Sequence, residues 1–159
     1  MNITLEADYA VRIVEMLANC AQRTDASQIS EITHVPQRFA LKILRKLVSA
    51  DLVRSYRGAS GGYELARPAG EITLRQVIEA IEGPFTISRC QDADYCCANS
   101  ACKVHKIYAE ISQLVREKLD GYTFDGEAIS DKSDQIKLSQ FCDNEKLAEG
   151  ESVSFFCFF

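Results

Sequence analysis

Residues 27–50 contain two short helical patterns, and the break between them constrains the fold of this chain more than any other feature. The first pattern covers residues 27–34 and stops before Pro36, because proline disfavours helix in the residue before it and suits the first position of a helix. A second, amphipathic pattern covers residues 36–50, with an apolar stripe formed by Phe39, Ile43, Leu44 and Leu47. Two short helices joined by a tight turn, the second one basic, predict a helix-turn-helix.

A β-hairpin is predicted directly after the second helix. Residues 52–56 and 63–66 alternate between apolar and polar side chains, and a glycine-rich turn over residues 57–62 separates them. Taken alone, this turn fits a tight hairpin with no ligand. A nucleotide-binding phosphate loop is poorly supported, because no Gly-Lys-Ser/Thr sequence follows and the next element is a strand. After a helix-turn-helix, the hairpin is best explained as a wing.

The charge is unevenly distributed. The whole chain of 159 residues has a formal net charge of −5, which argues at first sight against a nucleic-acid partner. Residues 36–67, however, carry seven basic and two acidic side chains, a net charge of +5. Residues 71–159 carry nine basic and sixteen acidic side chains, a net charge of −7. The predicted helix-turn-helix and wing are therefore basic, as a surface that binds DNA phosphates must be.

Candidate DNA-binding residues lie on the second helix and in the wing. Gln37 and Arg38 are near the start of the helix, where side chains reach base edges, and Gln and Arg suit adenine and guanine respectively. The other candidates are expected at phosphates or at the wing tip: Lys42, Arg45, Lys46, Arg57 and Ser60. The alternative is that the helical cations only make a surface helix soluble. The turn and the wing beside them favour double-stranded DNA as the partner.

Three further helices are predicted, over residues 5–20, 72–81 and 102–119, and residues 88–101 form a loop without periodicity. The last helix has one apolar stripe, which fits packing within the chain or, as we favour, a dimer seam. The fold class is mostly α with a small β wing: a winged helix-turn-helix plus a long dimerisation helix. We divide the chain into a winged helix-turn-helix domain (1–84), a cluster-binding loop (85–105), a dimerisation helix (106–122) and a weakly structured C-terminal tail (123–159).

Four of the seven cysteines lie within thirteen residues, and three of these are evenly spaced. Cys90, Cys96 and Cys102 follow the pattern Cys-x5-Cys-x5-Cys, and His105 comes three residues later, on the same face of the predicted helix. Three thiolates and an imidazole can close around one metal centre. Zinc sites usually present closer pairs of thiols, so the wide spacing fits an iron–sulfur cluster at least as well. Redox-active thiols without a metal are the third alternative.

Taken together, these motifs resemble the Rrf-two family of winged-helix regulators, of the IscR and NsrR type. The resemblance covers roughly residues 1–120 and rests on the opening residues 1–12 (MNITLEADYAVR), the helix-turn-helix, the wing turn RGASGGY at 57–63 and the pattern Cys-x5-Cys-x5-Cys-x2-His. It implies a homodimer that binds a palindromic operator and holds an iron–sulfur cluster in each subunit. The state of the cluster, which responds to redox conditions, nitric oxide, iron or cluster supply, would then control operator affinity.

The same resemblance assigns ligands. Cys90, Cys96 and Cys102 match the three cysteine ligands of the family. His105 matches the fourth ligand of the IscR type, which holds [2Fe–2S], whereas Asp8 matches the aspartate that reaches a [4Fe–4S] cluster from the partner subunit in the NsrR type. Both residues are present, so the fourth ligand and the nuclearity stay open.

Other classes of protein are less well supported. A zinc-stabilised or thiol-based winged-helix regulator is the nearest alternative, and an iron–sulfur electron carrier with a basic docking helix is the next. We do not expect an enzyme, because the sequence offers no Ser/His/Asp set and no nucleotide loop. No apolar run approaches the roughly 18–20 residues of a membrane span, and the N-terminus lacks the basic start of a signal peptide, so we expect a cytoplasmic protein.

Overall fold

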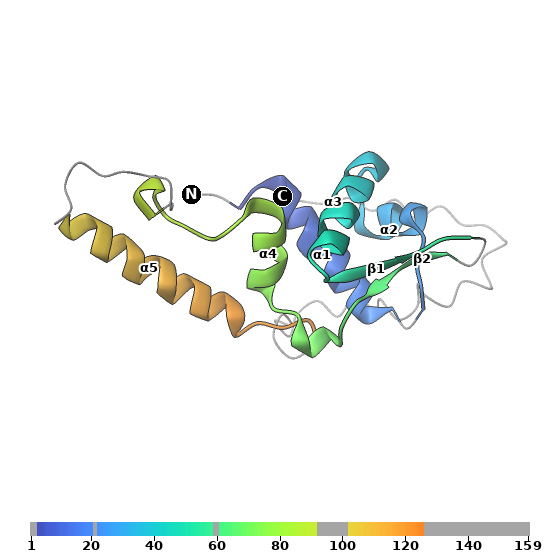
Figure 1. Cartoon of the computed structure of the whole chain (residues 1–159). Coiled ribbons are helices and arrows are strands. Elements are labelled where there is room, and N and C mark those ends of the chain that lie inside the picture. The colour runs from blue at the N-terminus through green and yellow to red at the C-terminus, as the bar shows by residue number, and fades with distance from the viewer. Residues whose placement is uncertain (1–2, 21, 59–60, 92–101, 126–159) are drawn as a thin grey trace, which may run out of the picture.

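The computed structural model describes residues 3–20, 22–58, 61–91 and 102–125. Within these ranges the chain is mostly helical with one two-stranded antiparallel sheet, which confirms the predicted fold class (Figure 1). All predicted helices and strands are present, with ends within two residues of the expected ones. Their order is α1 (Leu5–Asn19), α2 (Ala26–Thr33), α3 (Gln37–Ser49), β1 (Val53–Tyr56), β2 (Gly62–Leu65), the 3-10 turn η1 (Ala69–Glu71), α4 (Leu74–Glu82), the 3-10 turn η2 (Arg89–Gln91) and α5 (Lys103–Asp120).

Local signals set the ends of the first three helices. The Thr4 side chain accepts a hydrogen bond from the first turn of α1, and the Asp25 carboxylate accepts two from the first turn of α2. His34 ends α2 in the left-handed conformation, with φ 54°, and Pro36 follows as the N-cap of α3. The left-handed residue and the proline together make the tight turn that the helix-turn-helix pattern predicts.

The hydrophobic core lies within the winged half, where α1 contacts α2, α3 and α4. Burying each large aliphatic side chain contributes about 1.5–3 kcal/mol, so this cluster supplies most of the favourable free energy of folding. Its fully buried large side chains come from α1, α2, α3, β1, α4 and the connections between elements: Ile13, Val14, Ile29, Val35, Ile43, Leu44, Leu47, Leu52, Val53, Ile72 and Val77.

One member of the predicted α3 stripe lies at the surface. Phe39 retains 36% of its exposure, whereas Ile43, Leu44 and Leu47 are fully buried. The Phe39 ring contacts Tyr9 edge-on, with 6.3 Å between ring centroids. Phe39 belongs to the first turn of α3, which extends beyond the core. Helical spacing predicts which face of the helix Phe39 lies on, but not that this turn lies outside the core.

The wing is a short hairpin extended by a third segment. β1 and β2 pair antiparallel through four residue pairs, from Val53 opposite Leu65 to Tyr56 opposite Gly62. Thr24, in the connection between α1 and α2, forms an isolated antiparallel bridge with Tyr63 of β2. This bridge joins the wing to the segment that leads into the helix-turn-helix.

The segment after α4 leads outward from the winged half, and α5 runs back alongside it as a long arm that ends beside α4 (Figure 1). Its C-terminal end is fixed to α4, because Leu74 N donates to Tyr122 O at 2.9 Å and Phe124 is buried in the core. The predicted weakly structured tail begins at residue 123, but residues 123–125 pack on the winged half. The rest of the predicted tail lies outside the described residues.

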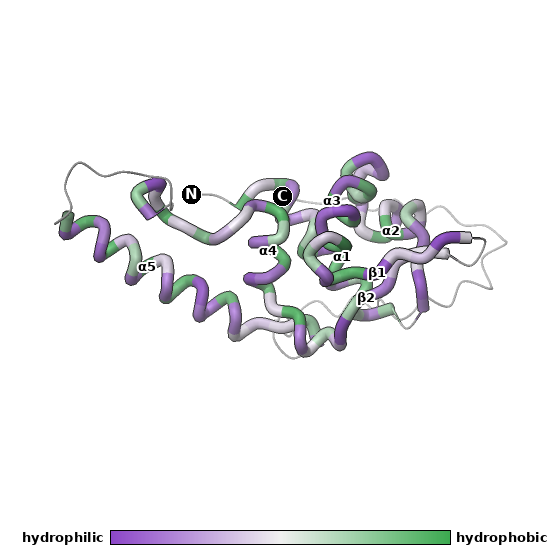
Figure 2. Tube along the Cα trace, viewed as in Figure 1, coloured by the Kyte–Doolittle hydropathy of each residue, from purple (hydrophilic) through white to green (hydrophobic). Residues whose placement is uncertain are grey.

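α5 has few contacts of its own along most of its length. Within it only Ser112 is fully buried, and four large apolar side chains are 40–64% exposed: Val104, Ile107, Ile111 and Leu114. Figure 2 shows the resulting alternation of hydrophobic and hydrophilic residues along the arm. None of the helices in the described ranges is long and apolar enough to cross a membrane.

Candidate nucleic-acid interface and cysteine-bearing segment

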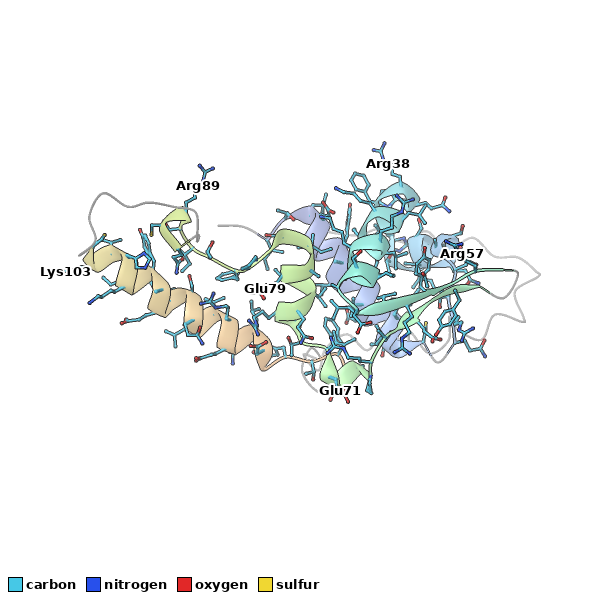
Figure 3. All side chains as sticks on the ribbon, in the orientation of Figure 1. Arg38, Arg57, Glu71, Glu79, Arg89 and Lys103 are labelled. Atoms are coloured by element: carbon cyan, nitrogen blue, oxygen red, sulfur yellow. The ribbon has the colours of Figure 1, made fainter. Side chains whose placement is uncertain are left out.

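The first turn of α3 presents the two residues predicted to reach base edges. The Arg38 side chain extends away from the body of the protein (Figure 3) and lies 5.1 Å from the centroid of the Phe39 ring. Gln37 is exposed, but its amide Nε2 donates a 2.9 Å hydrogen bond to Ser27 Oγ of α2. Arg38 is thus presented to solvent, whereas the Gln37 amide already links the two helices of the helix-turn-helix.

Both lysines predicted at phosphates have an acidic partner within the protein. Lys42 Nζ lies 2.9 Å from one carboxylate oxygen of Glu6, and Lys46 Nζ lies 2.8 Å from the other. Lys46 also donates to the carbonyl of Ile81 on α4. The hydrogen bonds from Lys46 and then Lys42 hold the pKa of the Glu6 carboxyl below its ordinary value. Glu6 therefore joins α1 to α3 and offsets part of the positive charge of the recognition helix.

The remaining DNA-binding candidates are only partly described. Arg45 is exposed on α3, and Arg57 is exposed immediately after β1 (Figure 3). Ser60 lies outside the described residues. Helix α3 and the wing therefore both carry exposed arginines.

The wing contains a cluster of side chains that the sequence did not indicate. The guanidinium carbon of Arg23 lies 3.6 Å from the centroid of the Tyr56 ring, and Arg23 Nε lies 2.9 Å from Glu64 Oε2. The Tyr56 hydroxyl donates a 2.6 Å hydrogen bond to Glu64 Oε1. Arg23 precedes the helix-turn-helix and is 41 residues from Glu64. No local pattern signals a contact over that separation.

The described cysteines of the predicted cluster loop lie at its two ends. Cys90 is in η2, and Cys102 is the N-cap of α5; both thiols are free and half-buried. His105 is exposed in the first turn of α5. Cys96, the middle predicted ligand, lies outside the described residues. The predicted loop over 88–101 differs where it is described, since residues 89–91 form a 3-10 turn.

The turn that carries Cys90 is fastened to the middle of α5. Ser112 Oγ donates a 2.9 Å hydrogen bond to Gln91 Oε1. The backbone amide of Ile87 donates to Gln91 Oε1 and to Ser112 Oγ. Arg116 adds a second connection, because its NH1 donates to the carbonyl of Phe85 at 3.2 Å. Residues 85–91 therefore cannot shift without disturbing contacts with α5.

Asp8, the alternative fourth ligand, is in the first turn of α1. Its carboxylate is half exposed and pairs with Arg12 at 2.8 Å. Within the described part of the chain, no three His, Cys, Asp or Glu side chains are grouped closely enough to hold a metal ion. The available donors are nevertheless of suitable chemistry for a cluster, because Cys90 and Cys102 are free thiols that border residues 92–101, the stretch that contains Cys96.

A tight helix-turn-helix, an arginine at the free end of its second helix and a following wing define a class: the winged-helix DNA-binding proteins. Residues 3–126 match the model of the Rrf2 family, described as an iron-dependent transcriptional regulator. The chain is 37% identical over 131 residues to protein aau3 of Rhizobium meliloti strain 1021, covering 79% of this chain and 83% of that protein. The chain therefore belongs to the Rrf2 family.

Further relatives and solved structures agree with this assignment. A protein of Azotobacter vinelandii assigned as an HTH-type transcriptional regulator, ORF2, is 32% identical over 141 residues, covering 87% of this chain and 86% of its own. The structure of CymR (YrzC), the global cysteine regulator of B. subtilis, matches with a TM-score of 0.65 at 23% identity, covering 79% of this chain and 94% of its own. IscR of T. potens matches with a TM-score of 0.61 at 22% identity, covering 79% and 85%. At these identities the two structures establish the fold.

The predictions of a DNA-binding transcriptional regulator and of a protein that is not an enzyme are confirmed by the family and by these relatives. Family membership also favours a regulator over the electron carrier considered from the sequence.

Proposed function

We propose that this regulator is a homodimer whose affinity for a palindromic operator depends on an iron–sulfur cluster held by Cys90, Cys96 and Cys102. The observation that carries the proposal is the position of the described thiols. Cys90 and Cys102 are free and border the segment that connects the DNA-binding half to α5. The description of the family as iron-dependent supports an iron-containing group. Acting on DNA, the protein would work in the cytoplasm.

The fourth ligand decides which cluster the protein would hold. His105 is exposed three residues after Cys102, so its imidazole is free to turn toward the thiols. Asp8 would first have to give up its 2.8 Å contact with Arg12. These contacts favour His105, which corresponds to [2Fe–2S], whereas Asp8 corresponds to [4Fe–4S]. When bound, either cluster supplies a redox-active centre whose potential depends on the fourth ligand and on the surroundings.

The exposed apolar face of α5 supports the homodimer. Val104, Ile107, Ile111 and Leu114 follow one another at intervals of three, four and three residues, which is the spacing of a helix-pairing seam. In a monomer, this continuous apolar row would remain in water. Pairing α5 with its partner-subunit counterpart would bury the row and give the protein the two-fold symmetry that a palindromic operator requires.

Connections in the middle and at the C-terminal end of α5 support communication between the cysteines and the DNA-binding half. Near the cysteines, Gln91 is hydrogen-bonded to Ser112. At the far end, Asp120 accepts hydrogen bonds from Thr73 and Arg75, at 3.1 and 2.8 Å, where α4 begins. A change in the cysteine-bearing segment would therefore shift α5 and, through α4, the separation of the two recognition helices in the dimer.

The test is anaerobic reconstitution with iron and sulfide, followed by native mass spectrometry and visible absorption. Wild type, Asp8→Ala and His105→Ala are compared, with Glu15→Ala as a matched carboxylate control on α1. A coloured dimer with cluster mass supports the proposal, and loss of the cluster in one variant identifies the fourth ligand. A colourless zinc protein would identify the zinc-stabilised alternative. A metal-free protein would identify the thiol-based alternative.

Operator affinity is then measured with and without the cluster. Allosteric coupling of ordinary size changes affinity about 5- to 150-fold. Equal affinity of the apo and reconstituted proteins at every salt concentration would refute cluster control and leave the DNA-binding function intact.

A further inference from the structure

The wing is too short to hold its own position. Its two strands form only four residue pairs, and an isolated two-stranded hairpin is marginally stable in water. A wing that contacts DNA must nevertheless be held in register with the recognition helix. The connection between α1 and α2 provides the support.

The first part of this support is a backbone contact. Thr24 N donates to Tyr63 O at 3.1 Å, and Tyr63 N donates to Thr24 O at 2.9 Å, which adds a third segment to the sheet. The approach is close because Gly62 has no side chain. A Cβ atom at position 62 would lie 2.9 Å from the carbonyl oxygen of Thr24.

The second part is the wing brace, formed by Arg23, Tyr56 and Glu64. Tyr56 is the last residue of β1 and Glu64 is in the middle of β2, so Arg23 contacts both strands at once. The hydrogen bond from Tyr56 and then that from Arg23 keep the pKa of the Glu64 carboxyl below its ordinary value, so the carboxylate is ionised at neutral pH. The brace pairs the positive charge of Arg23 with a carboxylate inside the wing.

The same short segment continues into the helix-turn-helix. Asp25 caps α2, and Ser27 Oγ accepts the hydrogen bond from Gln37 on the recognition helix. Residues 23–27 therefore connect the wing to α3 through contacts that follow one another without a break. Arg57 comes one residue after Tyr56, directly beyond the brace.

We propose that Arg23 is a positioning residue for DNA binding: by stacking on Tyr56 and pairing with Glu64, it fixes the wing, and with it Arg57, relative to the recognition helix. Its own guanidinium is engaged inside the brace and does not contact a phosphate. The proposal rests on the proposed binding to an operator and on the predicted contact of Arg57 with DNA, and it is independent of the cluster.

The test is a double-mutant cycle on the full-length protein. Wild type, Arg23→Ala, Arg57→Ala and the double variant are titrated by fluorescence anisotropy, at several salt concentrations, with a 26-bp duplex that the wild type selects from a random pool. Each single variant is expected to bind about fivefold to tenfold more weakly, as for the loss of one hydrogen-bonded contact. When Arg57 is already replaced by alanine, adding Arg23→Ala is expected to lower the affinity for DNA by less than about twofold. The reason is that Arg57 is no longer there to be positioned.

The salt dependence separates positioning from direct contact. Each phosphate contact contributes about 0.9 to the slope of log affinity against log salt. We expect the double variant to lose the same slope as Arg57→Ala alone. The proposal would be overturned if the losses of affinity in the two single variants added up in the double variant, and if its salt slope fell by the sum of the two single reductions. That result would show that Arg23 itself contacts a phosphate. Unchanged affinity in Arg23→Ala, or in Arg57→Ala, would overturn the proposal too.

Two further variants serve as controls, one for the size of the change in the brace and one for the loss of a positive charge. Tyr56→Phe removes only the hydroxyl that donates to Glu64. It is expected to weaken DNA binding less than Arg23→Ala does. Like Arg23→Ala, it is expected to do so only when Arg57 is present. Lys106→Ala removes one exposed positive charge from α5, and it is expected to bind like the wild type. All variants are compared in one cluster state, so a failure of cluster control would leave this result unaffected.

Discussion

The side-chain hydroxyl of Ser112, buried in the middle of α5, donates a 2.9 Å hydrogen bond to Gln91, the residue that follows Cys90. The same hydroxyl accepts a hydrogen bond from the backbone amide of Ile87 at 3.2 Å. One small side chain thus satisfies two polar groups of the segment that leads to the cysteines. Ser112 therefore makes two of the hydrogen bonds between that segment and α5, and Arg116 makes another.

Ser112→Ala is therefore expected to loosen residues 85–91. Removing the hydroxyl leaves partly buried polar groups with fewer partners, which costs about 1–2 kcal/mol in the free energy of unfolding. Urea denaturation measures the loss, and hydrogen exchange of the Ile87 amide locates it. Ser49→Ala is the control, because the exposed Ser49 hydroxyl only donates to the carbonyl of Arg45 in its own helix. Unchanged exchange at Ile87 in Ser112→Ala would contradict the expected connection.

Glu6→Gln is expected to strengthen binding to DNA and to steepen its salt dependence. The carboxylate pairs with Lys42 and Lys46 and so competes with DNA phosphates for them. Releasing both lysines adds up to two phosphate contacts, which increases the salt slope by as much as about 1.8. Anisotropy titrations from low to high salt measure this slope. A slope equal to that of the wild type would mean that these lysines serve only to join α1 and α3.

Glu6→Gln also measures how much the ion pairs of Glu6 contribute to the stability of the protein at each pH. The pKa of Glu6 is lowered in the folded protein by the two lysines, so the folded state favours the ionised carboxylate. The contribution is therefore complete above the ordinary glutamate pKa and disappears as the pH falls through the lowered value. Because the pair is partly exposed, it is worth at most about 1 kcal/mol. Thermal melts of wild type and Glu6→Gln should differ at pH 7 and converge in acid; a constant difference would exclude this cause.

Gly62→Ala is expected to destabilise the protein more than Gly58→Ala. Both glycines have positive φ, 150° and 103°, which a side chain tolerates poorly. Only at Gly62 would the new Cβ also meet backbone, 2.9 Å from the carbonyl oxygen of Thr24. We expect a loss of about 2–3 kcal/mol at Gly62 and about 1 kcal/mol at Gly58. Chemical denaturation measures both, and equal losses would show that the approach of Thr24 to the wing adds nothing.

The elements of the fold could be predicted because each is encoded locally. Thr4, Asp25 and Pro36 mark the starts of three helices, and alternating side chains around a glycine-rich turn mark the wing. The pairings within the candidate DNA interface could not be predicted, since Lys42 is 36 residues from Glu6 and Arg23 is 41 residues from Glu64. No periodicity connects such partners, because only the packed helices bring them together.

Residues outside regular patterns were also beyond sequence reasoning. Phe124 lies in a polar stretch at the end of α5, and it is buried because the chain folds back against η1, where its amide donates to Ala69 O. For the candidate metal site, spacing predicts which thiols are the ligands but gives no indication of the contacts that hold their segment against α5. The bond between Gln91 and Ser112 depends on how residues 85–91 lie along α5, which no spacing of residues encodes.

Ile107→Asp is expected to convert the protein into a folded monomer. Ile107 is 52% exposed in the single chain and lies within the apolar row on α5, so an aspartate there costs little in one subunit. In a helix pair it would place a charge inside the seam without a partner, which is strongly unfavourable. Size-exclusion chromatography with light scattering measures the mass, and circular dichroism checks that the subunit stays folded. Lys106→Ala changes the net charge by the same one unit outside the row and is expected to keep the wild-type mass. A dimeric Ile107→Asp variant would show that the subunits associate through another surface.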